Sequence, residues 1–398
     1  MGTYLDLQLL KQDLNTELIS ILDYWSKHSA DLENGGFYGQ INNLNQVNKE
    51  APKGLILHAR ILWSFAAAYR LNARLSDLEM ADRAFNFLIN HFLDKQNGGM
   101  FWSIRADQEP LDSKKQAYAL AFVIYGCSEY FLATGNEQSK LMAIDLFKKL
   151  EEYFWDPVDG GYIEAKTAKW DQLQDLRLSD KDANEPKTMN THLHILEAYT
   201  NLFRIWPDIR LRSKIIQLLW IFSEKILAKE TGHLQLFFSM DWSVQSGIIS
   251  FGHDIEAAWL LLEAAEVVKD DVLINLFRQN SVRMAEATLS GLDTDGGLWY
   301  ESDLSSGHMI REKHWWPQAE AMVGFFTAWQ VSGELKWLEF TLSSWKFIKN
   351  KIIDKERGEW FWGIDHTGKI LDKEDKAGFW KCPYHNGRAC LELIHRIQ

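Results

Sequence analysis

A short glycine-containing turn recurs six times along the chain, at nearly constant spacing. The copies are DLENGGFYGQI (31–41), DKQNGGMFWSI (94–104), DPVDGGYIEAK (156–166), the degenerate KETGHLQLFFS (229–239), DTDGGLWYES (293–302) and DKERGEWFWGI (354–364). Equivalent positions are 36, 99, 161, 233, 297 and 359, so successive copies lie about 62 to 72 residues apart. Self-similarity at a fixed period predicts a repeat architecture.

Each turn lies between two segments with helical patterns of different character. The segments that precede the turns are amphipathic, as helices at a protein surface are: 4–25, 77–93, 138–154, 210–228, 271–289 and 335–352. The segments that follow are apolar on nearly every side: 54–70, 117–132, 192–203, 253–265, 319–330 and 389–397. A helix that is apolar all round is buried all round.

Six alternations of an exposed and a buried helix predict an all-α fold, an (α/α)6 barrel. The apolar helices form its inner barrel and the amphipathic helices its outer wall, with short Gly/aromatic hairpins on one rim. We expect one catalytic domain over residues 1–398. An open solenoid of helix pairs is the alternative, but solenoids need polar terminal repeats, and the last unit here is as apolar as the middle ones.

Charge and composition narrow the class of protein. The net charge is −12, and no basic stripe or Lys/Arg cluster is present, which argues against binding to nucleic acid or to a membrane surface. No apolar run is long enough for a membrane span, and the N-terminal segment resembles an amphipathic helix rather than a signal peptide. Three cysteines without a CxxC pair suit a reducing compartment. We therefore expect a cytoplasmic protein, a monomer or a homodimer.

Polar residues gather where each apolar helix begins. In chain order they are His58 and Arg60; Lys115, Gln116 and Tyr118; Asn190, His192 and His194; His253, Asp254 and Glu256; His314, Trp315, Trp316 and Glu320; and Trp380, His385, Asn386 and Arg388. Parallel inner helices would bring these residues together at one end of the barrel. Burying such groups without partners costs roughly 1–3 kcal/mol each, so a ring of them indicates a functional site.

Some of these histidines have a simpler interpretation. A single histidine on an apolar helix is usually a hydrogen-bonded core residue, and we expect this of His58 and His192. His192 and His194 lie two positions apart and point to different sides of a helix, which argues against joint metal binding. Asn190 and His194 share one helix face.

The fourth apolar helix begins with His253 and Glu256, which also share a face. Glu256 is expected either to orient the His253 imidazole or to bind the substrate itself. Arg60 is either a functional residue or a structural ion-pair partner of Glu256. Trp316 and Trp380 either line a functional pocket or simply fill the mouth of the barrel.

The segment 164–190 is long, charged and poor in apolar residues, and Asp182 lies within it. It is either a solvated loop or a lid over the site, because long loops in compact domains are often functional.

Four stretches give the chain a specific resemblance. They are KGLILHARILWSFAAAYR (53–70), RLSDKDANEPKTMNTHLHILEAYTNLFR (177–204), FGHDIEAAWLLLEAAE (251–266) and GFWKCPYHNGRACLELIHR (378–396). With these stretches and its Gly turns, the chain resembles the cellobiose 2-epimerases of the N-acylglucosamine 2-epimerase superfamily over essentially its whole length. The resemblance implies the (α/α)6 barrel and inversion at C2 of the reducing-end glucose of β-1,4-linked disaccharides such as cellobiose and lactose. It also implies no redox cofactor and no metal.

The resemblance further assigns roles to residues of this sequence. His253 and His385 correspond to the two acid/base residues, His194 to a histidine that helps to open the sugar ring, and Arg60 to the group that polarises O1 and O2. The residues that correspond to sugar contacts are Tyr118, Asp182, Asn190, Glu256, Trp316 and Trp380.

Three other functions are open to a chain of this kind. Relatives within the superfamily act on free mannose or glucose, as epimerases or as aldose–ketose isomerases. Other (α/α)6 barrels are glycoside hydrolases, which need paired carboxylates; Glu256 and Glu320 are the available pair, but histidines outnumber acids here. A non-catalytic sugar-binding protein would need the tryptophans without convergent histidines.

Overall fold

The computed structural model describes residues 2–397, which form twelve α-helices in six pairs. The inner helices are α2 (Leu55–Asn72), α4 (Ala117–Thr134), α6 (Met189–Ile205), α8 (Phe251–Val268), α10 (Trp315–Ser332) and α12 (Tyr384–Arg396). The outer helices are α1 (Gly2–His28), α3 (Leu75–Phe87), α5 (Glu137–Tyr153), α7 (Ile209–Ile221), α9 (Asp271–Thr288) and α11 (Leu335–Phe347). Three outer helices end in one π-helical turn and α9 ends in a 3₁₀ turn: η1 (Leu88–Phe92), η2 (Phe222–Ile226), η4 (Ile348–Ile352) and η3 (Leu289–Gly291).

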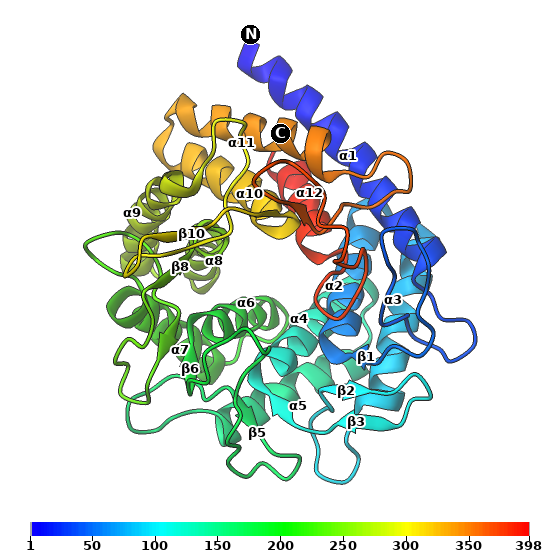
Figure 1. The fold of residues 1–398 in the computed structure, drawn as a ribbon. Coiled ribbons are helices and arrows are strands. Elements are labelled where there is room, and N and C mark those ends of the chain that lie inside the picture. Colours follow the sequence, from blue (N-terminus) through cyan, green and yellow to red (C-terminus); the bar gives the residue numbers. More distant parts are fainter. Residues whose placement is uncertain (1, 398) are drawn as a thin grey trace.

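The inner helices close into a ring (Figure 1). Each packs against the next, from α2 through α4, α6, α8 and α10 to α12, and α12 packs against α2. This closure confirms the (α/α)6 barrel and rules out the open solenoid. The expectation that no apolar run is long enough for a membrane span is wrong for α4, which among the described residues is the one helix long and apolar enough to cross a membrane. It passes because an inner helix is apolar all round, and 78% of that segment is buried inside the protein.

Short antiparallel strands join successive units at the rim where the inner helices begin. In five units, a strand directly before an inner helix pairs with a strand that follows the Gly turn of the next unit. The strands are β1 (Lys53–Gly54), β2 (Ser103–Ile104), β3 (Pro110–Asp112), β4 (Lys115–Gln116), β5 (Ala165–Lys166), β6 (Lys187–Thr188), β7 (Phe237–Phe238), β8 (Ile248–Ser250), β9 (Glu301–Asp303), β10 (His308–Ile310), β11 (Lys313–His314) and β12 (Gly363–Ile364). A bridge between Ile41 and Ala377 links the sixth unit to the first, so the hairpins also form a closed circle.

An ion pair recurs beneath these hairpins, and both of its side chains are buried except in the fifth unit, where the aspartate is half-buried. The aspartate that opens the turn accepts a hydrogen bond from a lysine that lies two residues before the following inner helix, or eight residues before it in the sixth unit, at 2.5–2.8 Å. The pairs are Asp31–Lys53, Asp94–Lys115, Asp156–Lys187, Asp293–Lys313 and Asp354–Lys376. The degenerate fourth unit has Ala228 at the aspartate position and the buried Ile249 two residues before α8. Two apolar residues thus replace the ion pair there.

His58 and His192 are hydrogen-bonded core residues, as expected. The backbone N–H of Phe37 donates to Nε2 of His58, at 3.2 Å, and that of Tyr162 donates to Nε2 of His192, at 2.8 Å. Each imidazole donates from Nδ1 to the carbonyl oxygen four residues earlier. Both rings therefore hold a Gly turn against its inner helix. In the fourth and fifth units Asp254 and Gln318 accept the equivalent N–H groups, from Leu234 and Leu298, at 2.7 Å.

Candidate active site

The inner helices begin earlier than the apolar pattern predicts, at Met189 for α6, Trp315 for α10 and Tyr384 for α12. The polar residues that interrupt the pattern therefore lie in the first helical turns rather than before them. Because each inner helix starts at the hairpin rim, these turns face one end of the ring. The structure confirms that polar side chains from several units meet there.

The guanidinium of Arg388 lies at the centre of this cluster and is completely buried. Its Nη1 donates to Oε1 of Glu197 and to the hydroxyl of Tyr384. Its Nη2 donates to Oε1 of Glu256, at 2.5 Å, and to Oε1 of Glu320, at 2.6 Å. One cation from α12 therefore holds three buried carboxylates, one each from α6, α8 and α10.

Two of these carboxylates orient histidines. Nδ1 of His194 lies 2.9 Å from Oε2 of Glu197, and Nδ1 of His385 lies 2.7 Å from Oε1 of Glu320. A carboxylate only accepts hydrogen bonds, so each imidazole carries its proton on Nδ1 and keeps the Nε2 lone pair free. Burial lowers the pKa of both imidazoles, and the carboxylate hydrogen bond partly offsets that effect.

His253 and His385 contact the same indole. The imidazole centroid of His253 lies 4.7 Å from that of Trp316, and the Trp316 centroid lies 5.6 Å from that of His385. His253 is half-buried, and its Nδ1 is hydrogen-bonded to Oγ of Ser250, at 2.9 Å. Burial lowers the pKa of His253 and of His385 to about 3. The two imidazoles predicted as a pair thus lie together and are neutral at neutral pH.

Arg60 lies on the other side of this cluster and is buried between aromatic rings. Its Nη2 donates to the hydroxyl of Tyr118, at 2.6 Å, and its Nη1 to the carbonyl oxygen of Trp380, at 3.3 Å. The guanidinium carbon lies 4.1 Å from the Phe122 ring centroid and 4.8 Å from that of Tyr384. His194 is adjacent, because its ring centroid lies 5.1 Å from that of Tyr118.

Two sequence-based interpretations of Glu256 are wrong. It forms its ion pair with Arg388 rather than with Arg60, and the side chain that hydrogen-bonds Nδ1 of His253 is Ser250. The physical reason is that Arg388, one helical turn after Tyr384, points into the barrel between the carboxylates. Oε2 of Glu256 is buried and has no hydrogen-bond partner. Burial and the nearby Glu320 raise the pKa of Glu256 to about 8, against the effect of Arg388.

Asn190 and Asp182 lie nearer the rim. Asn190 is in the first turn of α6, half-buried, and its Oδ1 has no partner. Asp182 accepts hydrogen bonds from the N–H and Oγ of Ser179, both at 2.9 Å. Burial raises the pKa of Glu301 in β9, and the charge of Asp182 raises it further, to about 7. Among the described residues, no hydrogen bond or ion pair joins Asp182 to His194, His253 or His385.

The charged segment that carries Asp182 is docked against the second unit. Nε2 of Gln116 donates to the carbonyl oxygen of Arg177, at 2.9 Å, and Nε1 of Trp170 donates to that of Asn97, at 2.9 Å. The segment is therefore anchored to the second unit at two points, although exposed residues such as Lys169, Asp171 and Asp180 keep much of it in contact with solvent.

Glu256, Glu320 and His385 have ligand atoms within 4.8 Å of one another, a spacing that also suits a metal ion. Nη2 of Arg388 lies between the two carboxylates, at hydrogen-bonding distance from each. The guanidinium thus supplies the positive charge at this position.

Two members of the cluster, Glu197 and Tyr384, were not predicted from the sequence. Glu197 lies three residues after His194 and Tyr384 lies four residues before Arg388. Both spacings place a pair of side chains on one helix face, and an isolated acid in an apolar helix is a signal in its own right.

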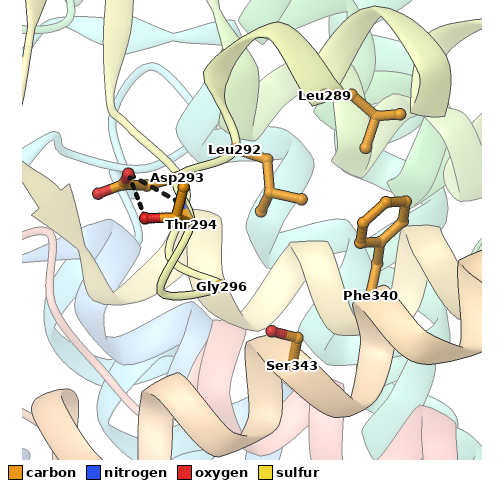
Figure 2. A pocket seen from close by; sticks show the side chains of 7 residues that line it. All are labelled: Leu289, Leu292, Asp293, Thr294, Gly296, Phe340 and Ser343. Carbon is orange, nitrogen blue, oxygen red and sulfur yellow. Dashed lines mark hydrogen bonds between the residues drawn. The ribbon is translucent and has the colours of Figure 1, made fainter.

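Two cavities lie away from this cluster. One, of about 350 Å³, lies between the fifth Gly turn and α11, lined by Leu289, Leu292, Asp293, Thr294, Gly296, Phe340 and Ser343 (Figure 2). The other, of about 530 Å³, lies among the C-terminal halves of α6, α8, α10 and α12. Its wall includes Trp259, whose Nε1 donates to Oε2 of Glu320, at 3.1 Å. Neither cavity contains a predicted catalytic residue.

A closed (α/α)6 ring brings imidazoles, an arginine and an indole together at the helix N-termini. Similarity to known proteins places the chain among the carbohydrate 2-epimerases, a class of isomerases. The sequence model of the N-acylglucosamine 2-epimerase (GlcNAc 2-epimerase) family matches residues 36–389, and the chain belongs to that family.

Relatives of this chain agree with that assignment. The cellobiose 2-epimerase of Bacteroides fragilis is 49% identical over 388 residues, which are 97% of this chain and 99% of that protein. The cellobiose 2-epimerase of Dictyoglomus turgidum is 38% identical over 99% of this chain and 100% of its own length. The solved structure of cellobiose 2-epimerase from Spirochaeta thermophila superposes with a TM-score of 0.92, at 39% identity, covering 98% of this chain and 97% of that one. The resemblance inferred from sequence motifs is thereby confirmed.

Proposed function

We propose that this chain inverts C2 of the reducing-end glucose of cellobiose, converting the gluco to the manno configuration, and that it treats lactose in the same way. The observation that carries the proposal is the placement of His253 and His385 against one indole, Trp316. Two neutral imidazoles around a shared aromatic surface suit a reaction that removes a proton from one face of a carbon and returns one to the other. The similarity to two cellobiose 2-epimerases over almost the whole chain supports the disaccharide.

The reaction begins with the closed pyranose, whose ring opens with the help of His194. One imidazole of the His253–His385 pair then takes the proton from C2, which leaves an enediolate. Rotation about C2–C3 presents the opposite face, and the second imidazole delivers a proton there. The negative charge that develops on the enediolate raises the pKa of a nearby imidazole, so the second histidine takes up its proton from solvent as that charge appears. The first histidine then releases the proton taken from C2 to solvent, and both imidazoles return to the neutral form.

Arg60 stabilises the enediolate in this scheme. Its guanidinium is permanently charged and is held by two hydrogen bonds, so it needs no rearrangement as negative charge develops on O1 and O2. The N-termini of the inner helices add favourable dipoles at the same end of the ring. Asn190 and Glu256 each have a buried oxygen without a partner, which suits acceptance of a hydrogen bond from a sugar hydroxyl.

The carboxylate geometry does not favour hydrolysis. Oε1 of Glu256 and Oε1 of Glu320 both accept from the same nitrogen of Arg388, at 2.5 and 2.6 Å. Glycosidases separate their two carboxyl groups by at least about 5 Å, so that they flank the scissile bond. Here the carboxylates surround a guanidinium instead.

Product analysis by NMR in heavy water tests the proposal, with cellobiose, lactose, glucose and mannose as substrates. We expect glucosyl-mannose from cellobiose, with deuterium at C2. Free glucose from cellobiose would indicate hydrolysis, and turnover of the monosaccharides alone would indicate the mannose-type activity. Failure to exchange the C2 proton of any aldose would overturn the epimerase mechanism altogether.

A further inference from the structure

We propose that Arg388 is a positioning residue that fixes two histidines at once, His194 through Glu197 and His385 through Glu320. The inference rests on the proposed function, because it assigns a role to Arg388 within that reaction. It makes the ring-opening histidine and one of the C2 proton-transfer histidines depend on a single guanidinium.

The two arms of the guanidinium lead to different helices. Nη1 donates to Oε1 of Glu197, whose other oxygen accepts from Nδ1 of His194, at 2.9 Å. Nη2 donates to Oε1 of Glu320 at 2.6 Å, and the same oxygen accepts from Nδ1 of His385, at 2.7 Å. Each arm therefore fixes the tautomer and the orientation of one imidazole, and leaves its Nε2 lone pair free for chemistry.

The plane of the guanidinium is itself fixed. Its central carbon lies 4.8 Å from the ring centroid of Trp259 and 4.3 Å from that of Tyr384. The side chains of Arg388 and of the three carboxylates are each about 1% exposed. With one cation among three carboxylates, removal of Arg388 would leave buried negative charge without a partner. Lysine keeps the charge but presents a single point rather than a planar fork, so it cannot hold both arms.

The charges that face each imidazole support a shared role. Glu320 raises the pKa of His385, whereas Arg60 and Arg388 lower it. Glu197 raises the pKa of His194, and the same two arginines lower it. Among the described residues, Arg388 is the one arginine or lysine that forms an ion pair with both Glu197 and Glu320.

The test compares Arg388→Lys with Arg396→Lys. Arg396 is two helical turns further along α12, lies 5.4 Å from the same Trp259 ring and bonds Glu392 and Thr327, away from the cluster. Two rates are measured with cellobiose: anomeric exchange of the reducing end, which reports ring opening, and deuterium entry at C2. We expect R388K to lower kcat for both at least about 100-fold, since a misplacement near 1 Å can cost that much, with KM changed less than about threefold. R396K should stay within about twofold of wild type.

Two single-arm variants, each of which changes the carboxylate on one side of the guanidinium, test the inference even if R388K does not fold. Glu197→Gln should slow anomeric exchange more than it slows deuterium entry from the open-chain form, and Glu320→Gln should do the reverse.

Nitrogen NMR of histidine-labelled protein adds a direct readout: R388K should change the tautomer signals of His194 and His385 and leave those of His58 and His192 unchanged. Wild-type rates in R388K, or unchanged tautomers in R388K and both single-arm variants, would overturn the inference. A wild-type enzyme that exchanges no C2 proton would instead overturn the proposed function.

Discussion

Nδ1 of His385 lies 2.7 Å from Oε1 of Glu320, a hydrogen bond between the sixth and the fifth inner helices. The same oxygen accepts from Nη2 of Arg388, which is on the same helix as the histidine. The orientation of this imidazole is therefore set by the packing of α12 against α10, and not by local sequence alone.

The first prediction concerns the proton-transfer pair. Replacing His253 or His385 by Asn should lower the epimerisation rate of cellobiose by about 10²- to 10⁴-fold, the usual contribution of a general acid or base. Circular dichroism should show an unchanged fold. His395→Asn is the matched control, because His395 is exposed near the far end of α12. Near-normal turnover in either active-site variant would remove that residue from the mechanism.

The second prediction concerns Arg60. Arg60→Lys should lower kcat by about 10²-fold, because the variant loses a preorganised donor to the developing enediolate oxygens and the stacking between Phe122 and Tyr384. Arg70→Lys, on the same helix but about half exposed at the surface, should change kcat less than twofold. Steady-state kinetics with cellobiose decide the matter; equal effects in the two variants would contradict the role of Arg60.

The third prediction separates structural from functional histidines. His192→Ala should lower the free energy of unfolding by about 1–3 kcal/mol, because the buried N–H of Tyr162 loses its acceptor. His192→Gln should recover part of this loss, since Gln318 already does the same task in the fifth unit. Urea unfolding provides the measurement, and kcat of the folded variants should stay close to wild type. A stable but inactive H192A enzyme would place His192 in the site instead.

The fourth prediction is the pH dependence of stability. Burial lowers the pKa of His58 to about 3 and of His192 to about 4 in the folded protein, below the value of about 6.5 for an unfolded histidine. Between these values the unfolded chain binds more protons, so the contribution of both residues is complete above pH 6.5 and declines as the pH falls towards 4. Urea midpoints at pH 7 and pH 5 should differ more in wild type than in His192→Gln; an equal decline would argue against this origin.

The fifth prediction uses the fourth unit as a template. Lys115→Ile alone leaves Asp94 buried without its lysine, and breaking a buried pair in this way costs about 3–5 kcal/mol. The double variant Asp94→Ala/Lys115→Ile copies Ala228 and Ile249 and should lose less stability than K115I. Thermal unfolding of the two variants gives the comparison. A double variant less stable than K115I would show that the ion pair is not what makes the single change costly.

The fold was predictable because the helical periodicity and the Gly turns repeat, so that each unit supports the interpretation of the others. The residues at which α6, α10 and α12 begin were not predicted correctly. Asn190, Trp316 and His385 lie in the first helical turn, before the start that the apolar pattern predicts, and all three are predicted site residues. A helix whose first turn carries polar side chains therefore begins earlier than its apolar pattern predicts.

The Arg388 cluster could not be assembled from sequence. Its contacts join α6, α8, α10 and α12 across as many as 191 residues, and spacing along one helix says nothing about which partner a side chain meets on another. Glu256 illustrates the limit: its place on the face of α8 was predicted, but its partner was not.

The closure of the ring by α12 has a consequence for folding as well as for chemistry. Tyr384, His385 and Arg388 all belong to this helix, which packs against α2 and α10. During synthesis the five preceding helix pairs leave the ribosome before it, and none of them contains these three groups. The proposed mechanism therefore predicts that the nascent chain is inactive until α12 packs into the ring, so that turnover of the sugar would report that the ring has closed. Limited proteolysis or mild denaturant that releases α12 should accordingly silence the enzyme while most of its helical content persists.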